Sequence, residues 1–426
     1  MRIAESLALL RFRRTRLSAL VHRARVGIAS QGVPAILRKL NREKGAPRPA
    51  AVAASAEPGI PRVLVIDAVL PRPDRDSGSQ RAVQLLKLIR ECGYAVDFLA
   101  ERGAQEGPHL AALRDLGIRV LPSSDPARDF LHAIRAGADY RAVIVCRYHL
   151  AEYWMPFVAA HLPHAKRILD TVDLHHLRES REAALHGNRR LQALAASTRR
   201  RELAAIDASD EAWVVSPEES RVLQTLGCRR PVRLVPNLHE PAPQLPRFDG
   251  RDGVLFVGGA GHPPNVDAVR WLLQDILPGI HATRPDIRVH LVGTGLSAVV
   301  PDPLPPGVAC HDHVPDLGPL LDAVRIGIAP LRFGAGVKGK VSQCLALGVP
   351  VVATPCAAEG LRLEHGVNAL IAEDARSFAA QIVRLHDDRA LWDTLSRNGR
   401  EVIAAHFSPS TLRPTIAASL ANPPSA

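Results

Sequence analysis

Residues 326–361 read IGIAPLRFGAGVKGKVSQCLALGVPVVATPCAAEGL. The β-branched start, Ile326–Ala329, predicts a buried strand, and the glycines that follow predict a loop with unusual backbone dihedral angles. A helix is expected over Lys340–Leu347, ended by Gly348, and a second buried strand over Val349–Thr354. This alternation of strand, loop, helix and strand is typical of a parallel sheet covered by helices.

The loop of this stretch has two features that favour an anion. Free N–H groups at the start of the expected helix point at the loop, and the helix dipole adds partial positive charge there. Arg332, Lys338 and Lys340 place three cations in the same loop, around Gly336. We therefore predict a phosphate or pyrophosphate site. The alternative is an ordinary βαβ turn in which glycines and basic residues occur by chance.

The segment Gly348–Thr354, read GVPVVAT, resembles the donor-site signature of the GT-B nucleotide-sugar glycosyltransferases. It is most similar to glycosyltransferase family 4, the glycosyl transferases group 1, whose members retain anomeric configuration. The resemblance extends over most of residues 62–410. It implies an α/β chain with two Rossmann-like, doubly wound parallel-sheet domains facing a cleft. It also implies a nucleoside diphosphate sugar as co-substrate, no cofactor, and no metal in the donor site.

This chain departs from the family pattern at two carboxylates. Ala335 and Gln343 stand where family members carry glutamates that are expected to hold the sugar and the ribose. Gln343 can still hydrogen-bond a hydroxyl, and Glu359 is a second candidate for ribose hydroxyls, or else a loop carboxylate paired with a nearby arginine. Gly258 and Gly259 occupy the loop where many members place an arginine and a lysine. We therefore expect the cations of the 326–361 stretch to hold the donor diphosphate beside these glycines.

Two stretches of the first domain carry further candidates. Ser77 and Gly78 open an expected helix and resemble the glycine-rich acceptor-side loop of the family, although a plain helix cap is an equal alternative. Asp173 and His175 follow an expected strand over Arg167–Leu169, at the strand end where open α/β sheets place ligands. They are the catalytic candidates. The alternative is a helix N-terminus with Asp173 as its cap.

The length of 426 residues predicts two domains with additional segments. In the second domain, Asn265 is expected to cap the helix that it precedes. The predicted organisation is a basic helical appendage at 1–45, a Pro/Ala linker at 46–60, an N-terminal acceptor domain at 61–240, a C-terminal donor-binding domain at 251–405, and a crossing helix with a tail at 406–426.

Positive charge is concentrated at the N-terminus. The chain has a net charge of +11, and residues 1–45 hold eleven Lys or Arg against two Glu, so most of the excess lies there. This weakens a nucleic-acid interpretation of the main body. One helical stripe of the segment is apolar, with Ile3, Leu7, Leu10, Leu17, Val21 and Ile28. Such a helix can lie on an anionic membrane, and the alternative is a solvated helix.

The six cysteines are scattered without a Cys-x-x-Cys pair, which indicates reduced thiols in a cytoplasmic protein. No apolar run reaches the ~20 residues that span a bilayer. The predicted localisation is therefore cytoplasmic, with peripheral contact at the inner membrane face.

The predicted function is glycosyl transfer from a nucleoside diphosphate sugar to a glycan or lipid-linked acceptor in cell-surface polysaccharide biosynthesis. Two alternatives stay open. The chain could be a catalytically silent subunit that binds a nucleotide sugar or a partner enzyme, which the changes at Ala335 and Gln343 favour. It could also be a GT-B nucleotide-sugar epimerase.

Overall fold

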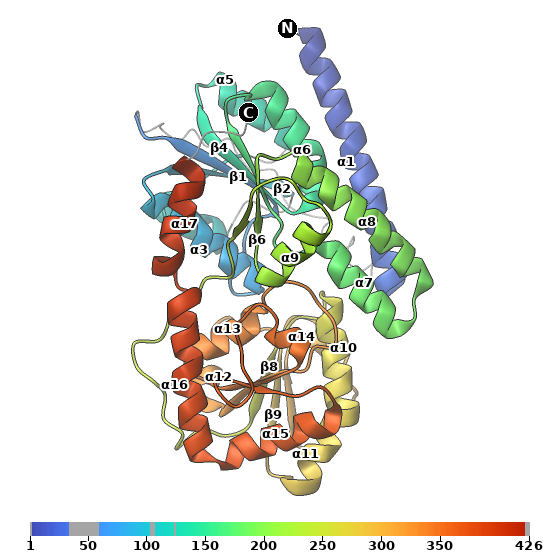
Figure 1. Ribbon diagram of the computed structural model, residues 1–426, viewed down its shortest axis with the longest axis vertical. Coiled ribbons are helices and arrows are strands. Elements are labelled where there is room, and N and C mark those ends of the chain that lie inside the picture. The colour runs from blue at the N-terminus through green and yellow to red at the C-terminus, as the bar shows by residue number, and fades with distance from the viewer. Residues whose placement is uncertain (1, 34–58, 103–106, 123–124, 422–426) are drawn as a thin grey trace. The chain divides into compact units, whose positions relative to one another are not determined.

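The computed structural model describes residues 2–33, 59–102, 107–122 and 125–421, so most of the expected linker lies outside them. The chain divides into two compact units (Figure 1). The first unit holds Met1–Arg72, Ala82–Val235 and Arg413–Ala426, and the second holds Pro73–Arg81 and Pro236–Leu412. Each unit is built around one parallel sheet, which confirms the predicted fold class.

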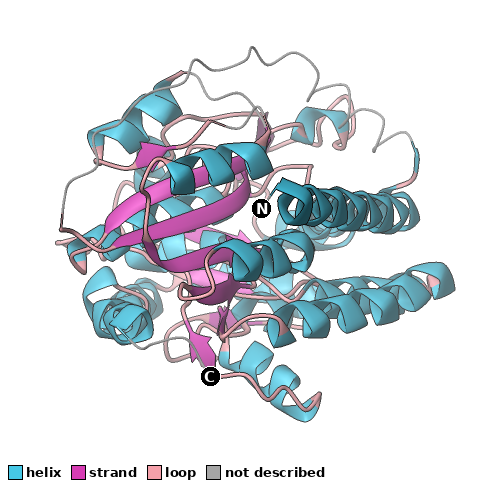
Figure 2. Ribbon diagram, turned by 90° about the horizontal axis from the view of Figure 1, so that it is seen from above, coloured by secondary structure: helices cyan, strands magenta, loops and turns pink. Residues whose placement is uncertain are grey.

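The first sheet has seven strands in the order β3-β2-β1-β4-β5-β6-β7. They are β1 (Arg62–Val69), β2 (Ala95–Arg102), β3 (Arg119–Val120), β4 (Tyr140–Cys146), β5 (Lys166–Asp170), β6 (Glu211–Val214) and β7 (Val232–Leu234). The central strands are nearly continuous apolar runs because helices cover both faces of the sheet (Figure 2). The strand order reverses between β1 and β4, and the carboxyl ends of these neighbours form a ligand-binding position in open α/β sheets.

The described helices of this unit alternate with its strands, as doubly wound sheets require. They are α1 (Arg2–Gln31), α3 (Ser77–Glu91), α4 (Pro108–Asp115), α5 (Pro126–Arg135), α6 (Tyr148–His161), α7 (His175–His186), α8 (Arg189–Asp207), α9 (Pro217–Thr225) and, returning from the far end of the chain, α17 (Pro409–Ala421). The return of α17 is fixed by Ser419, whose hydroxyl contacts Trp213 and Glu211 of β6.

The first helix, α1, is part of the core of the first unit and does not stand apart as an appendage. Phe12 is 4% exposed, and its ring centroid lies 4.9 Å from those of Tyr153, Trp154 and Phe157 on α6. Further along, His22 Nε2 lies 2.9 Å from the hydroxyl of Thr198 on α8. Figure 1 shows α1 running beside both helices.

The opposite side of α1 is apolar and exposed. Four residues of the stripe predicted from the sequence face outward, with Leu7 55%, Leu10 65%, Leu17 63% and Val21 43% exposed. Ile28 of the same stripe is partly buried, and Leu20, outside the predicted stripe, is 45% exposed. The helix therefore has two apolar faces, of which only the face of Phe12 is buried in the described part of the chain. No described helix is long and apolar enough to cross a membrane.

The second sheet has six parallel strands in the order β10-β9-β8-β11-β12-β13. They are β8 (Val254–Val257), β9 (Val289–Val292), β10 (Val308–His311), β11 (Ile326–Ala329), β12 (Val351–Ala353) and β13 (Leu370–Ile371). The helices are α10 (Pro263–Trp271), a π-helical turn over Leu272–Ile276, α11 (Leu277–Thr283), a 3₁₀ turn over Leu296–Ala298, α12 (Gly318–Ala323), α13 (Gly339–Ala346), α14 (Pro355–Ala358), α15 (Ala375–Asp387) and α16 (Arg389–His406). The 326–361 stretch thus forms β11, a loop, α13 and β12, as predicted.

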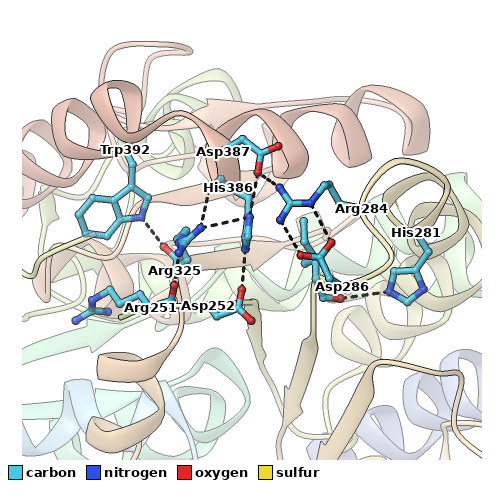
Figure 3. A network of polar contacts seen from close by, with 10 residues as sticks. Arg251, Asp252, His281, Arg284, Asp286, Arg325, His386, Asp387 and Trp392 are labelled. Carbon is cyan, nitrogen blue, oxygen red and sulfur yellow. Dashed lines mark hydrogen bonds and ion pairs between the residues drawn. The ribbon is translucent and has the colours of Figure 1, made fainter. Parts of the chain in front are cut away.

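A polar network ties the start of this sheet to its last helices (Figure 3). His386 Nε2 of α15 lies 2.9 Å from Asp252 Oδ1, directly before β8. Arg325, directly before β11, donates to the carbonyl of His386 and accepts at its own carbonyl from the indole N–H of Trp392. Arg284 joins Asp286 to Asp387. Asp252 and Arg325 precede β8 and β11. The network therefore lies at the amino ends of these strands, opposite to their carboxyl ends.

Candidate functional site

The loop between β11 and α13 is built for close approach of its backbone. Gly336 has φ of 67°, a left-handed conformation that glycine adopts without steric cost. Lys338 is the N-cap residue of α13, so the free N–H groups of the first helical turn follow it directly. The backbone geometry is that of a helix N-terminus that attracts anions.

Both lysines at this end of α13 have hydrogen-bond partners, Lys338 within the loop and Lys340 in α10. Lys338 is only 8% exposed, because its ammonium group turns back and donates to the Gly336 carbonyl at 2.6 Å. The side chain of Lys338 is therefore buried within the loop. Lys340 donates to Asn265 Oδ1 at 2.6 Å, and its ammonium lies 4.3 Å from the centroid of the Phe256 ring. Burial, with a contribution from Lys338, lowers the pKa of Lys340 to about 7.

Arg332 has a carboxylate partner. Its Nε donates to Asp267 Oδ2 at 2.9 Å, and a second guanidinium nitrogen contacts Asp267 Oδ1. The guanidinium also lies 5.7 Å from the centroid of the Trp271 ring. The hydrogen bonds to Asp267 raise the pKa of Arg332. Its charge is compensated within the second unit, so Lys338 and Lys340 are the stronger candidates for a diphosphate.

The glycine loop after β8 lies close to Lys340. A Cβ atom on Gly258 would lie 2.7 Å from Lys340 Nζ, and Gly259 accepts a hydrogen bond of 2.9 Å from Asn265 Nδ2. The prediction that Asn265 caps α10 is wrong, because His262 occupies the N-cap position. Instead Asn265 links the glycine loop to Lys340. Sequence patterns did not identify this role, since Asn265 and Lys340 are 75 residues apart.

The remaining candidates for donor and acceptor binding lie on α13, at the end of α14 and on α3. Gln343 lies in α13 and is partly buried, and Glu359 is the C-cap residue of α14. Ser77 and Gly78 open α3, where Asp76 Oδ1 accepts a 2.7 Å hydrogen bond from the backbone of Ser79. Their roles in binding sugar, ribose or acceptor stay predictions. No group of three or more His, Cys, Asp or Glu suited to a metal ion occurs among the described residues.

In the first unit, Asp173 and His175 are neighbours at the end of β5. Asp173 Oδ1 lies 3.2 Å from His175 Nε2, and Asp173 also binds Arg178. Burial raises the pKa of Asp173, but the charges of Arg178 and His175 outweigh it and hold that pKa well below its usual range. The pKa of His175 is lowered, chiefly by burial. An ionised Asp173 beside the His175 imidazole can orient a ligand and stabilise positive charge.

Buried glutamates hold the backbone that follows Asp173. Glu202 of α8 accepts hydrogen bonds from the backbone N–H groups of His175 at 2.8 Å and His176 at 3.1 Å. Glu219 of α9 accepts from the backbone of Leu174, the N-cap residue of α7, at 2.8 Å. Asp173 is therefore not the helix cap. Glu202 and Glu219 supply that function from distant positions in the sequence, and no local sequence pattern indicates this role for them.

Comparison with known proteins identifies the second unit. Residues 251–388 match the family described as Glycosyl transferases group 1. The second unit is a group 1 glycosyltransferase domain. A protein of Klebsiella pneumoniae, named only as an uncharacterized 44.6 kDa protein in cps region, is 29% identical over 140 residues. That match covers 30% of this chain and 36% of the Klebsiella protein.

Solved structures extend the likeness to both units. Sucrose-phosphate synthase from Thermosynechococcus elongatus has a TM-score of 0.64 at 18% identity, over 84% of this chain and 97% of its own. HepE of Anabaena, in complex with UDP and glucose, has a TM-score of 0.62 at 15% identity, over 84% of this chain and 99% of its own. At these identities the likeness shows the fold alone. The chain has the GT-B fold, with the glycosyltransferase domain as its second unit.

Proposed function

We propose that this chain transfers a sugar, with retention of configuration, from a nucleoside diphosphate sugar to a glycan or lipid-linked acceptor. The loop of Lys338 and Lys340 at the start of α13, within a group 1 glycosyltransferase domain, carries this proposal. The Klebsiella relative in a cps region supports polysaccharide biosynthesis as the setting. The HepE structures with UDP and UDP-glucose support a nucleotide sugar as the donor.

The second unit would act mainly on the leaving group. As the glycosidic bond to the diphosphate breaks, negative charge grows on the phosphate oxygens. The N–H groups at the start of α13 and the ammonium of Lys340 are fixed before that charge develops, so they stabilise it without reorganising. Gln343 and Glu359 are assigned to hydroxyl groups of the sugar and ribose. No cofactor or metal is required for this step.

The outward face of α1 is proposed to bind an anionic membrane. Its exposed apolar residues, Leu7 to Val21, lie on the side away from Phe12, so binding would not disturb the core. Arg11, Arg14 and Arg25 are exposed on the same helix and complement anionic headgroups. The contact would keep the protein at the membrane face where a lipid-linked acceptor lies.

A transfer assay tests the proposed function. The full chain is incubated with a panel of nucleoside diphosphate sugars, with and without lipid-linked glycan acceptors, and products are analysed by mass spectrometry. We expect a glycosylated acceptor and free nucleoside diphosphate only when donor and acceptor are both present. An altered donor formed without acceptor would indicate an epimerase, and donor binding without turnover would indicate a silent subunit.

A further inference from the structure

The carboxyl ends of β1 and β4, where the strand order reverses, bring basic groups together in the first unit. Arg147 directly follows β4 with φ of 74°, an uncommon backbone conformation for a residue with a side chain. Its Nε lies 3.1 Å from Asp67 Oδ1 of β1. Positive φ at such a position costs energy, and strained residues of this kind cluster at ligand sites.

His149, two residues further along, is a buried polar group without a protein partner. His149 is 3% exposed, and neither nitrogen of its ring has a hydrogen-bond partner among the described residues. The ring centroid lies 5.8 Å from that of His175, which in turn lies 5.1 Å from the ring of Tyr148. Buried polar atoms are nearly always hydrogen-bonded, so this imidazole is available to a ligand.

The first helix, α1, packs against α6, the helix that carries His149, and brings a further cation to that side of the first unit. Arg23 of α1 is partly buried, and no carboxylate pairs with it in the part of the chain that the structure describes. Burial, with smaller contributions from the charges of Arg102 and Arg147, lowers the pKa of Arg23 to about 10. Like charges held together at a partly buried position are unfavourable unless an anion offsets them.

We propose that Arg23, Arg147 and His149 form a binding site for a phosphate group carried by the acceptor. A phosphate brings up to two negative charges and several acceptor oxygens, which match two guanidinium groups and an imidazole N–H better than a single carboxylate does. This assignment rests on the proposed function, since it specifies the acceptor as a phosphorylated molecule. Asp67 orients Arg147, and Tyr148 packs beside the site.

The experiment compares Arg23→Gln with the matched control Arg25→Gln, two residues away on the same helix and exposed. Thermal unfolding of the full chain is followed over a titration with inorganic phosphate, which stabilises the folded state if it binds there. We expect the apparent phosphate affinity to fall about tenfold or more in Arg23→Gln and to stay unchanged in Arg25→Gln. His149→Asn, which alters the site from α6, should weaken phosphate binding as well.

Without phosphate, Arg23→Gln should unfold at the same temperature as the wild type or higher, because it removes a cation that has no carboxylate partner. A lower unfolding temperature together with unchanged phosphate affinity would mean a structural role and overturn the proposal. Unchanged affinity in both Arg23→Gln and His149→Asn would also overturn it. A parallel titration with UDP separates the two proposals. UDP should bind wild type and Arg23→Gln equally, and its failure to bind either would contradict the proposed function alone.

Discussion

At the scale of single residues, Lys340 makes a testable link between charge and binding. Its pKa is lowered from 10.5 to about 7 in the folded protein, so much of it is neutral above that pH. A bound diphosphate favours the ammonium form and raises this pKa. UDP affinity should therefore fall as the pH rises from about 7 to 9, with uptake of a proton on binding. Calorimetry over this range checks it, and Lys340→Met should remove the dependence.

The same shift has a consequence for stability without ligand. Between pH 7 and 10.5 the unfolded chain holds a proton on Lys340 that the folded chain has released. The unfolded state then binds more protons, so this residue makes the folded state relatively more stable as the pH rises through that window.

For the binding prediction, a UDP affinity that does not change between pH 7 and 9 would contradict the assignment of Lys340 to the donor site.

Gln343 stands where the family resemblance implies a glutamate, and its contribution can be measured. Gln343→Ala should lower kcat/KM by about 2- to 12-fold, the loss of one neutral hydrogen bond to a hydroxyl. Gln343→Glu should be tolerated or mildly harmful, because a carboxylate accepts the same bonds but donates none. Steady-state transfer rates distinguish the two. If neither variant changes the rate, Gln343 has no part in the site.

The sequence predicted which residues supply positive charge, but not what they contact. Lys338, Lys340 and Arg332 lie within one short stretch and are visible in the pattern. The partners of two of them, Asn265 and Asp267, lie 75 and 65 residues away in another helix. Only the parallel order of β8 and β11 brings α10 beside this loop, so the compensation of Arg332 could not be read from the local motif.

At the scale of elements, the two faces of α1 can be tested separately. The face of Phe12 stabilises the fold, and the exposed face of Leu17 is the one proposed to bind a membrane. Phe12→Ala should lower the free energy of unfolding by about 3–5 kcal/mol, because a buried aromatic ring leaves a cavity among the rings of α6. Leu17→Ser, on the exposed face, should change it by less than about 0.5 kcal/mol. Urea unfolding measures both. Equal effects of the two substitutions would mean that α1 is not packed as described.

The exposed face of α1 has its own test on vesicles. The double variant Leu10→Ser with Leu17→Ser should bind phosphatidylglycerol-containing vesicles at least tenfold more weakly than the wild type, since both side chains enter the apolar boundary of the bilayer. Leu185→Ser, an exposed leucine on α7, is the control and should bind as the wild type does. Equal sedimentation of all three proteins with vesicles would show that this face has no membrane role.

The periodicity of α1 predicted the apolar stripe but not which way it faces. Phe12 and Ala19 lie off that stripe, yet they are the apolar residues buried against the first unit. A helix with two apolar faces satisfies the same sequence pattern in either orientation. The choice depends on tertiary contacts of Phe12 with α6, which no local pattern reports.

At the scale of the whole molecule, the alternation of strands and helices predicted a parallel sheet covered by helices, and the family resemblance implied two such domains. Continuous apolar runs such as Val63–Ile66 and Val143–Val145 indicate strands covered on both faces, and short glycine turns indicate the reversals. The sequence predicted that a C-terminal helix crosses back, as α17 does, but it did not predict that α1 packs into the first unit. Both α1 and α17 pack on the first unit through a few buried contacts, such as Phe12 and Ser419.

The most direct test of the central claim is amide hydrogen exchange of the full chain with and without UDP. If the loop before α13 holds the diphosphate, exchange should slow at residues 336–341, with smaller effects in the glycine loop at 258–259. Exchange at residues 251–252 and 386–387, in the polar network at the opposite edge of the sheet, should stay the same. Tight UDP binding that leaves 336–341 unprotected would contradict the account.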